Sequence, residues 1–238
     1  PKVERAFGKW GTGETPVKNI ANVENAEQPR IYLVDRPASE QSILFAALLA
    51  TPKANPDEIA TEAMNDIIGG MSTSRINMNL REDKGWSYGA HSGLSGAKGQ
   101  RLFYIFSSVQ TDKTRESIDE VMKELTTFVT SSPATGEELE KSVASNTLSL
   151  SGRWESSGAV MGSISQIVQY GLPDAYFDEY AGKVDALTLD EVRQISNRII
   201  KPDAITWVVV GDRTIIEEDL IKLGFGEINL IDADGNAL

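Results

Sequence analysis

The sequence predicts an α+β fold: a two-layer sandwich in which a mixed or antiparallel sheet packs against helices. Segments with strand patterns come in adjacent pairs, paired helical segments separate them, and one more strand pattern follows the last helices. Strands that pair with their sequence neighbours favour this fold over a doubly wound one, in which strands and helices alternate singly.

Short apolar or alternating runs bounded by Gly, Pro, Asn and Asp indicate the strands. The run at 42–50 is the most apolar, so we expect it to be largely buried. The glycine-containing loop 93–101 predicts an antiparallel pair on its two sides. Gly211-Asp212 closes the last run, which we expect to be the terminal strand. The predicted strands are 30–35, 42–50, 86–92, 102–110 and 205–210.

Capping residues indicate where the helices begin and end. Asn55, followed by a proline and an acid, is the expected N-cap of the first helix. Gly69-Gly70 is expected to end that helix in a left-handed C-cap. Capping boxes at Thr135 and Thr188 open two later helices. The predicted helices are 55–70, 72–82, 118–128, 135–151, 155–171 and 188–198.

Composition excludes several classes of function. The 238 residues carry 23 Lys and Arg against 35 Asp and Glu, a net charge of −12, which argues against a nucleic-acid partner. There is no Cys and one His, His91, so thiolate metal sites, disulfides and zinc sites with two imidazoles are excluded. The longest apolar run, 43–50, is far shorter than the roughly 20 residues of a membrane helix, so no membrane span is expected.

One stretch is more specific than the rest of the chain. It reads Gly69-Gly70-Met71-Ser72-Thr73-Ser74-Arg75-Ile76, then Leu80-Arg81-Glu82-Asp83-Lys84-Gly85-Trp86-Ser87-Tyr88. This stretch resembles the C-terminal half of the pitrilysin/insulinase family of zinc metallopeptidases, the inverzincins. In that family a glycine-rich turn precedes a helix ending in Leu-Arg, and a Tyr follows seven positions after the Arg; here 88 − 81 = 7. The resemblance covers about 5–225, through Phe7–Trp10, Pro29–Gln41, Gln169–Pro173, Thr188–Glu191 and Val208–Asp212.

The resemblance implies an insulinase-like peptidase domain that lacks the zinc site. The family binds zinc through H-x-x-E-H and a downstream Glu, whereas this chain has only His91. It therefore implies a non-catalytic half that binds no metal itself and closes over a zinc-bearing half, either in another subunit or upstream in the same polypeptide. Carried over from the family, Tyr88 would bind the scissile carbonyl of the substrate and Arg81 the next carbonyl.

Simpler interpretations compete at the same positions. Arg81 can complement the dipole at a helix end, and Tyr88 can pack within a strand. His91 is interpreted as a strand residue satisfied by a neighbour, because no second imidazole or thiol could join it as a ligand. A serine hydrolase using His91 is disfavoured, since no G-x-S-x-G elbow is present. Helix capping and solvation explain the acids that could otherwise form a carboxylate pair: Glu82, Asp83, Glu137 and Glu138.

We expect three parts: an upstream tail and linker at 1–29, the non-catalytic domain at 30–225, and a flexible tail at 226–238. The last includes Asp232–Asn236, which looks like a calcium loop but lacks the full set of ligands. The expected function is binding of substrate peptide during hydrolysis by a zinc-bearing partner, in a heterodimer where that partner is a separate chain. The alternative is a catalytically silent scaffold with the peptidase fold. The resemblance to bacterial relatives favours a periplasmic or otherwise exported location, with a cytoplasmic one as the alternative.

Overall fold

One six-stranded sheet organises the computed structural model, which describes residues 1–14, 16–17 and 19–238. Its strand order is β3-β4-β2-β5-β1-β6. Strands β2, β3 and β4 pair antiparallel and β2 also pairs antiparallel with β5, whereas β1 runs parallel to both β5 and β6. The sheet is therefore mixed, as predicted. The strands are β1 Arg30–Asp35, β2 Gln41–Ala50, β3 Ser87–Leu94, β4 Arg101–Gln110, β5 Thr206–Gly211 and β6 Ile228–Ile231.

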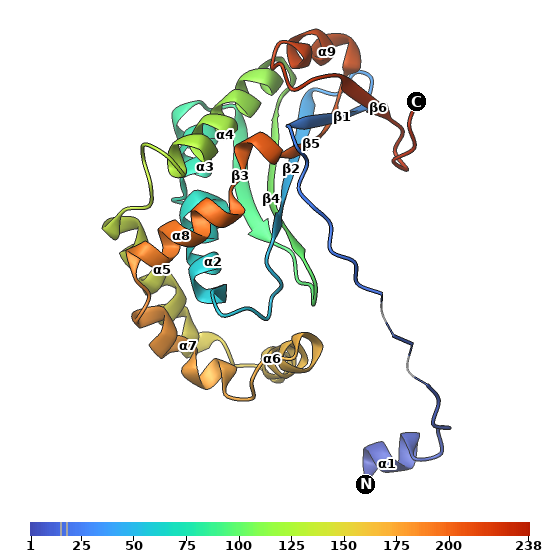
Figure 1. Ribbon diagram of the computed structural model, residues 1–238, viewed down its shortest axis with the longest axis vertical. Helices are drawn as coiled ribbons and strands as arrows, with labels where there is room; N and C mark the ends of the chain where they lie inside the picture. The colour runs from blue at the N-terminus through green and yellow to red at the C-terminus, as the bar shows by residue number, and fades with distance from the viewer. Residues whose placement is uncertain (15, 18) are drawn as a thin grey trace.

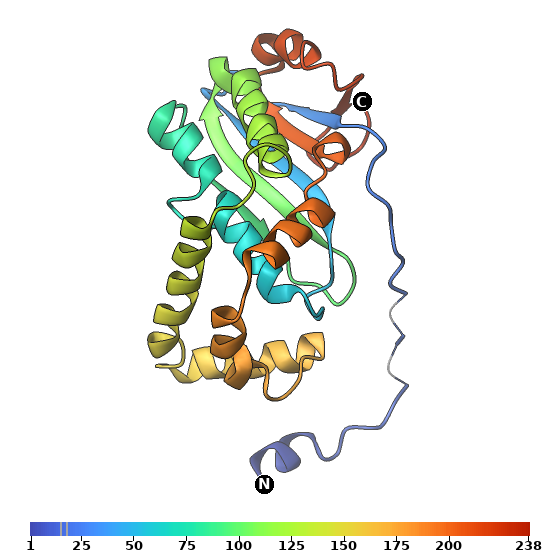
Figure 2. The same ribbon diagram turned by 60° about the vertical axis from the view of Figure 1, so that its left-hand side comes forward.

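Most of the helices lie on one face of this sheet (Figures 1 and 2). The α-helices are α1 Lys2–Phe7, α2 Glu58–Asn65, α3 Arg75–Asn77, α4 Thr114–Phe128, α5 Gly136–Leu148, α6 Ser157–Tyr170, α7 Tyr176–Asp185, α8 Leu189–Ile199 and α9 Arg213–Ile221. Two π-helical segments, η1 Asp66–Gly70 and η2 Met78–Asp83, continue α2 and α3. Short 3₁₀ turns are η3 Thr111–Lys113, η4 Ser149–Gly152 and η5 Pro202–Ala204.

Alternation along the strands separates a buried face from an open one. In β2 the side chains of Leu44, Ala46 and Leu48 are buried under the helices, and those between them are only half-buried. The same alternation occurs in β4 and β5. Period-2 patterning of this kind places every second side chain on the helix-covered side. The sheet thus has a second face that no helix covers in the described part of the chain (Figures 1 and 2).

Two of the predicted caps are confirmed. Thr135 and Thr188 each form a complete capping box with the glutamate three residues on. Helix α6 ends at Gly171, whose φ of 70° is left-handed. Helix α4, predicted over 118–128, begins at Thr114 and buries Ile118, Val121 and Leu125 in the core.

The predicted N-cap at Asn55 is wrong. Helix α2 begins at Glu58, and the Asn55 side chain instead accepts the Asp57 N–H at 2.9 Å in the preceding turn. Glu58 is not a surface acid of the first turn, because it forms buried ion pairs with Arg101 and with Lys53. The pair with Arg101 joins the helix start to β4, 43 positions away, and the pair with Lys53 joins it to the turn just before the helix.

The predicted left-handed C-cap at Gly69-Gly70 is also wrong. Both glycines lie in η1, and neither has a positive φ. A Cβ on Gly69 would lie 2.5 Å from the Ser92 hydroxyl oxygen, and one on Gly70 would lie 2.6 Å from the Asn65 side-chain nitrogen. Gly69 is required by the close approach of the β3 backbone, whose Ser92 nitrogen would lie 2.6 Å from the added Cβ, whereas at Gly70 the Asn65 side chain could move aside.

The C-terminal part differs from the prediction. Strand β5 is not terminal, because α9 follows it and β6 then pairs with β1. Residues 226–238 were expected as a flexible tail, yet Ile228–Ile231 belongs to the sheet. The apolar pattern there is too short to be recognised without its partner strand.

Two regions lie away from the sheet. Helices α5 to α7, the last of them absent from the predicted set, form a small second core around Tyr176, Tyr180 and Val184. Helix α1 also lies away from the sheet and buries none of its side chains (Figure 1), whereas the later part of the N-terminal segment returns to the sheet, where the Asn25 side chain accepts the Leu49 N–H of β2 at 3.1 Å. Among the described residues no helix combines the length and the apolar character that crossing a membrane requires.

Candidate functional site

Arg81 and Tyr88 line the same hollow at one end of the sheet. The hollow has a volume of 290 Å³ and is formed by η1, η2 and the start of β3. Its wall also includes Gly69, Gly70 and His91. The segment singled out in the sequence therefore folds back on itself, and it brings the predicted pair of side chains to one place.

Tyr88 is placed there by an irregularity in β3. The register with β4 shifts between Ser87 and Ala90, so the strand bulges at Tyr88. The Ser87 hydroxyl accepts the Gly89 N–H at 3.0 Å, and the Asn77 side chain accepts the Ala90 N–H at 3.1 Å. Bulges redirect side chains, and this one leaves Tyr88 90% exposed on an otherwise paired strand. The competing interpretation, in which Tyr88 packs within the strand, does not fit this exposure.

Arg81 lies on η2, a π-helical turn of the kind that is frequent at functional sites. Its side chain is 51% exposed, and its one ion pair in the described chain is with the neighbouring, equally exposed Glu82 at 3.2 Å. Such surface pairs contribute little, so most donors of the guanidinium are free for a ligand.

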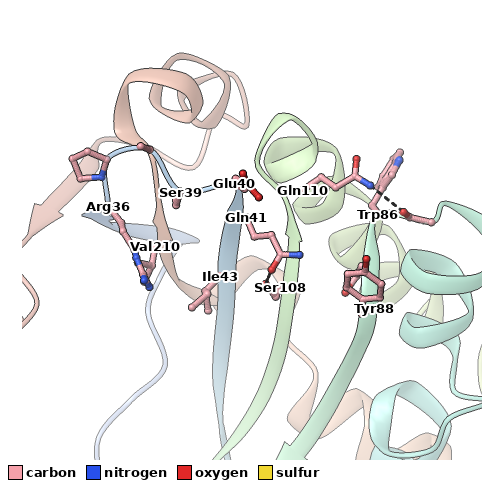
Figure 3. A pocket seen from close by; sticks show the side chains of 14 residues that line it. Arg36, Ser39, Glu40, Gln41, Ile43, Trp86, Tyr88, Ser108, Gln110 and Val210 are labelled. Carbon is pink, nitrogen blue, oxygen red and sulfur yellow. Dashed lines mark hydrogen bonds between the residues drawn. The ribbon is translucent and has the colours of Figure 1, made fainter.

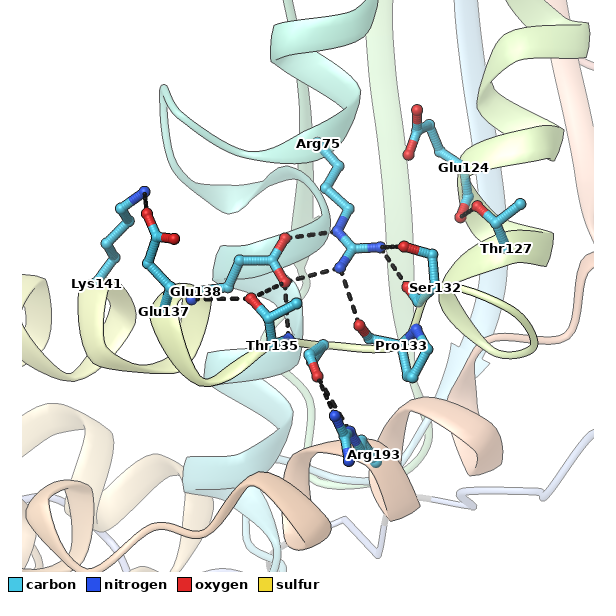
Figure 4. A network of polar contacts seen from close by, with 11 residues as sticks. Arg75, Glu124, Thr127, Ser132, Pro133, Thr135, Glu137, Glu138, Lys141 and Arg193 are labelled. Atoms are coloured by element: carbon cyan, nitrogen blue, oxygen red, sulfur yellow. Dashed lines mark hydrogen bonds and ion pairs between the residues drawn. The ribbon is translucent and has the colours of Figure 1, made fainter.

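Arg75, at the other end of the same helical segment, is fully engaged (Figure 4). Its Nε and one terminal nitrogen donate to both carboxylate oxygens of Glu138, at 2.6 and 2.7 Å. It also donates to the carbonyls of Ser132 and Pro133, and its guanidinium lies 4.8 Å from the centre of the Phe128 ring. Burial raises the pKa of Glu138, but the hydrogen bonds from Arg75 and Thr135 outweigh it and lower this pKa below its usual value. Arg75 thus fixes the segment that carries Arg81.

A second, larger hollow adjoins the first on the open face of the sheet (Figure 3). It has a volume of 980 Å³ and is lined by the loop between β1 and β2 and by the neighbouring ends of β3 and β4. Ser87, Tyr88 and Ser108 line both hollows. Tyr88 therefore stands at their junction.

The other residues considered in the sequence form no site of their own. His91 is exposed in the smaller hollow, where its ring centre lies 5.4 Å from that of Phe106. Glu137 pairs with Lys141. The described residues contain no group of three or more His, Asp or Glu side chains that could hold a metal ion. The family's zinc therefore does not fit this chain.

Sequence reasoning missed the residues that position the pair. Ser87 holds the bulge from within the strand, and Asn77 holds it from α3, across a contact between segments that no local pattern reports. Arg75 was part of the recognised motif, but its partner Glu138 lies 63 positions away.

Comparisons with known proteins agree with this architecture. The family model described as "Peptidase M16 inactive domain" matches residues 1–146. A peptidase M16 inactive domain from Pseudomonas fluorescens is 22% identical with a TM-score of 0.74, over 84% of this chain and 47% of that one. A protease from Helicobacter pylori is 15% identical with a TM-score of 0.76, over 87% of this chain and 50% of that one. The periplasmic protease PqqL from Escherichia coli is 15% identical with a TM-score of 0.66, over 87% of this chain and 23% of that one. The chain thus spans half or less of these structures, and no curated protein matches its sequence.

Proposed function

The chain belongs to the M16 peptidase family as an inactive domain, and we propose that it is the non-catalytic half of a zinc metallopeptidase. In this function it closes over a zinc-bearing half and binds the backbone of the substrate peptide through Arg81 and Tyr88. The zinc-bearing half is either a second subunit or an upstream part of the same polypeptide.

The observation that carries this proposal is that two side chains with free hydrogen-bond donors, Tyr88 and Arg81, line the same hollow. Attack of water on a peptide carbonyl produces an oxyanion, and donors aimed at it lower the barrier. Tyr88 offers a neutral hydroxyl, and Arg81 offers a charged fork suited to carbonyl oxygens. Both are donors that the rest of the described chain leaves largely free.

The open face of the sheet supports the expectation of a partner. Half-buried Phe45, Tyr104 and Phe106 lie on it, and the rings of Phe45 and Tyr104 stack with their centres 5.7 Å apart. Apolar faces left uncovered are typical of interaction surfaces. We propose that this face turns toward the zinc-bearing half and the enclosed peptide, so that the site is complete only after closure.

We further propose that the domain responsible for this function extends from residue 30 through β6 to residue 231, with 1–29 as tail and linker, and that the protein works in the periplasm or another exported setting. The similarity to a protease that is itself periplasmic is in line with export.

The test is peptide hydrolysis by the chain combined with its zinc-bearing half. Each half alone is expected to be inactive and the combination active. Tyr88→Phe is expected to lower turnover by roughly 10²–10³-fold, the usual effect of one oxyanion donor. Circular dichroism and co-purification check that the variant folds and assembles like the wild type. If the combination containing Tyr88→Phe hydrolyses peptide at the wild-type rate, Tyr88 does not have this role. If the zinc-bearing half is fully active without this chain, the scaffold alternative is favoured.

A further inference from the structure

The function proposed above assigns no ligand to the larger hollow, although Tyr88 lines it. Its volume of 980 Å³ lies at the upper end of the range of about 300–1,000 Å³ typical of small-ligand sites. Because Tyr88 stands at the junction of the two hollows, a peptide held at Tyr88 and Arg81 has a direct continuation into the larger one.

The loop between β1 and β2, residues 36–40, is held rigidly along the edge of this hollow. Ala38 has a φ of 58°, which a non-glycine residue adopts only where its surroundings impose it. Its N–H donates to the Asp212 carboxylate at 2.7 Å, and the Arg36 N–H donates to the Gly211 carbonyl at 2.8 Å. The Thr111 hydroxyl donates to the carbonyl of Ser39 at 2.9 Å. A loop fixed in this way loses little freedom when a ligand binds.

Arg36 is the cation of this hollow, and its charge is not neutralised. Its side chain is exposed and makes no ion pair in the described part of the chain. Figure 3 shows it running beside Val210 on the open face, while Glu40, the one acid lining this hollow, lies on the far side of Ser39. The guanidinium is therefore open to a ligand from the hollow.

We propose that the larger hollow is a charge-selective subsite, in which Arg36 binds an acidic side chain of the substrate peptide. The proposal rests on the function proposed above and adds a substrate class to it. A guanidinium binds a carboxylate through two parallel hydrogen bonds. The chain's net charge of −12 attracts basic peptides in general, so a preference for an acidic one must come from a local cation.

Binding to the chain itself tests this without the zinc-bearing half. The probes are short blocked peptides of Ala and Ser that carry one Asp or one Lys at each position in turn. Their affinities are measured by NMR titration of the isotope-labelled chain. The indole N–H of Trp86, which lines the hollow, is the reporter and is assigned with Trp86→Phe.

The best Asp peptide is expected to bind up to about fivefold more tightly than its Lys counterpart, the effect of one exposed ion pair. Arg36→Glu is expected to reverse this preference. Arg30→Glu, the same change in an exposed residue at the other end of β1, is expected to leave it unaltered. Equal binding of the two peptides, or the same loss of preference in both variants, overturns the subsite. Since hydrolysis is not the readout, this outcome is distinct from a failure of the reconstituted peptidase.

Discussion

Arg75 and Arg81 lie on one continuous helical segment but differ in everything that surrounds them. The Arg75 side chain is 14% exposed and donates to a carboxylate and to two backbone carbonyls. The Arg81 side chain is 51% exposed and meets only its neighbour Glu82. An arginine whose donors are all satisfied inside the chain holds the fold together, whereas one with free donors at a hollow is available to a ligand. The same residue type thus has a structural role at one end of the segment and, in our proposal, a substrate-binding role at the other.

The largest expected effect is a loss of stability when Arg75 is replaced. Arg75→Ala leaves Glu138 half-buried without its partner, and breaking a buried ion pair costs about 3–5 kcal/mol. Because Glu138 retains some exposure, we expect a loss of about 3 kcal/mol in the free energy of unfolding. Urea unfolding followed by circular dichroism measures it.

Arg81→Ala is the matched control for that change. Surface ion pairs contribute about 0–1 kcal/mol, so its free energy of unfolding is expected to stay close to that of the wild type. If the two variants are destabilised equally, the distinction between an engaged and a free arginine is wrong.

A second effect concerns the glycines that line the hollow beneath Arg81. In Gly69→Ala the new Cβ would lie 2.5 Å from the Ser92 hydroxyl oxygen and 2.6 Å from the Ser92 backbone nitrogen. Overpacking of this kind costs about 1–3 kcal/mol, so we expect a loss of about 2 kcal/mol in thermal or urea unfolding.

Gly182→Ala offers the opposite case within helix α7. A Cβ there meets nothing within 4 Å, and alanine is the better helix former. That variant is expected to gain about 0.5–1 kcal/mol. If Gly69→Ala is stabilising as well, in contrast to the loss expected for it, η1 and β3 do not approach as closely as the structure indicates.

Local sequence patterns predicted most of the helices and strands, but often not the residues at which they begin and end. Thr135 and Thr188 cap the helices they were expected to cap, because a capping box is complete within four residues. Asn55 failed as a cap, because the helix begins at Glu58, whose buried ion pair with Arg101 joins it to a strand 43 positions away. Strand β6 was not predicted for a similar reason, since it is stabilised by pairing with β1, at the other end of the domain in sequence.

For the candidate site, the resemblance supplied Arg81 and Tyr88 as a pair, and the structure places both at one hollow. Their roles in binding substrate stay a prediction. The β-bulge that exposes Tyr88, and Asn77 that supports it, could not be predicted, because both depend on the pairing of β3 with β4 and on its contact with α3. Arg36 carried no signal either, since an arginine before a proline reads only as the end of a strand.

The smallest expected effect is a pH dependence of the stability that the Arg75–Glu138 ion pair contributes. The pKa of Glu138 is lowered in the folded protein, so its charged form stabilises the fold above the usual glutamate pKa of 4.5. This contribution is lost as the pH falls through the lowered value. Glu138→Gln is therefore expected to be less stable than the wild type by about 1 kcal/mol at pH 7, and the difference should vanish in strong acid. Glu137→Gln, on the same helical turn but 77% exposed, should show no such trend. Urea unfolding at a series of pH values from 7 down to strong acid measures the free energy of unfolding of both variants and of the wild type. If the stability difference between Glu138→Gln and the wild type grows toward low pH, the ion pair is not what anchors the segment.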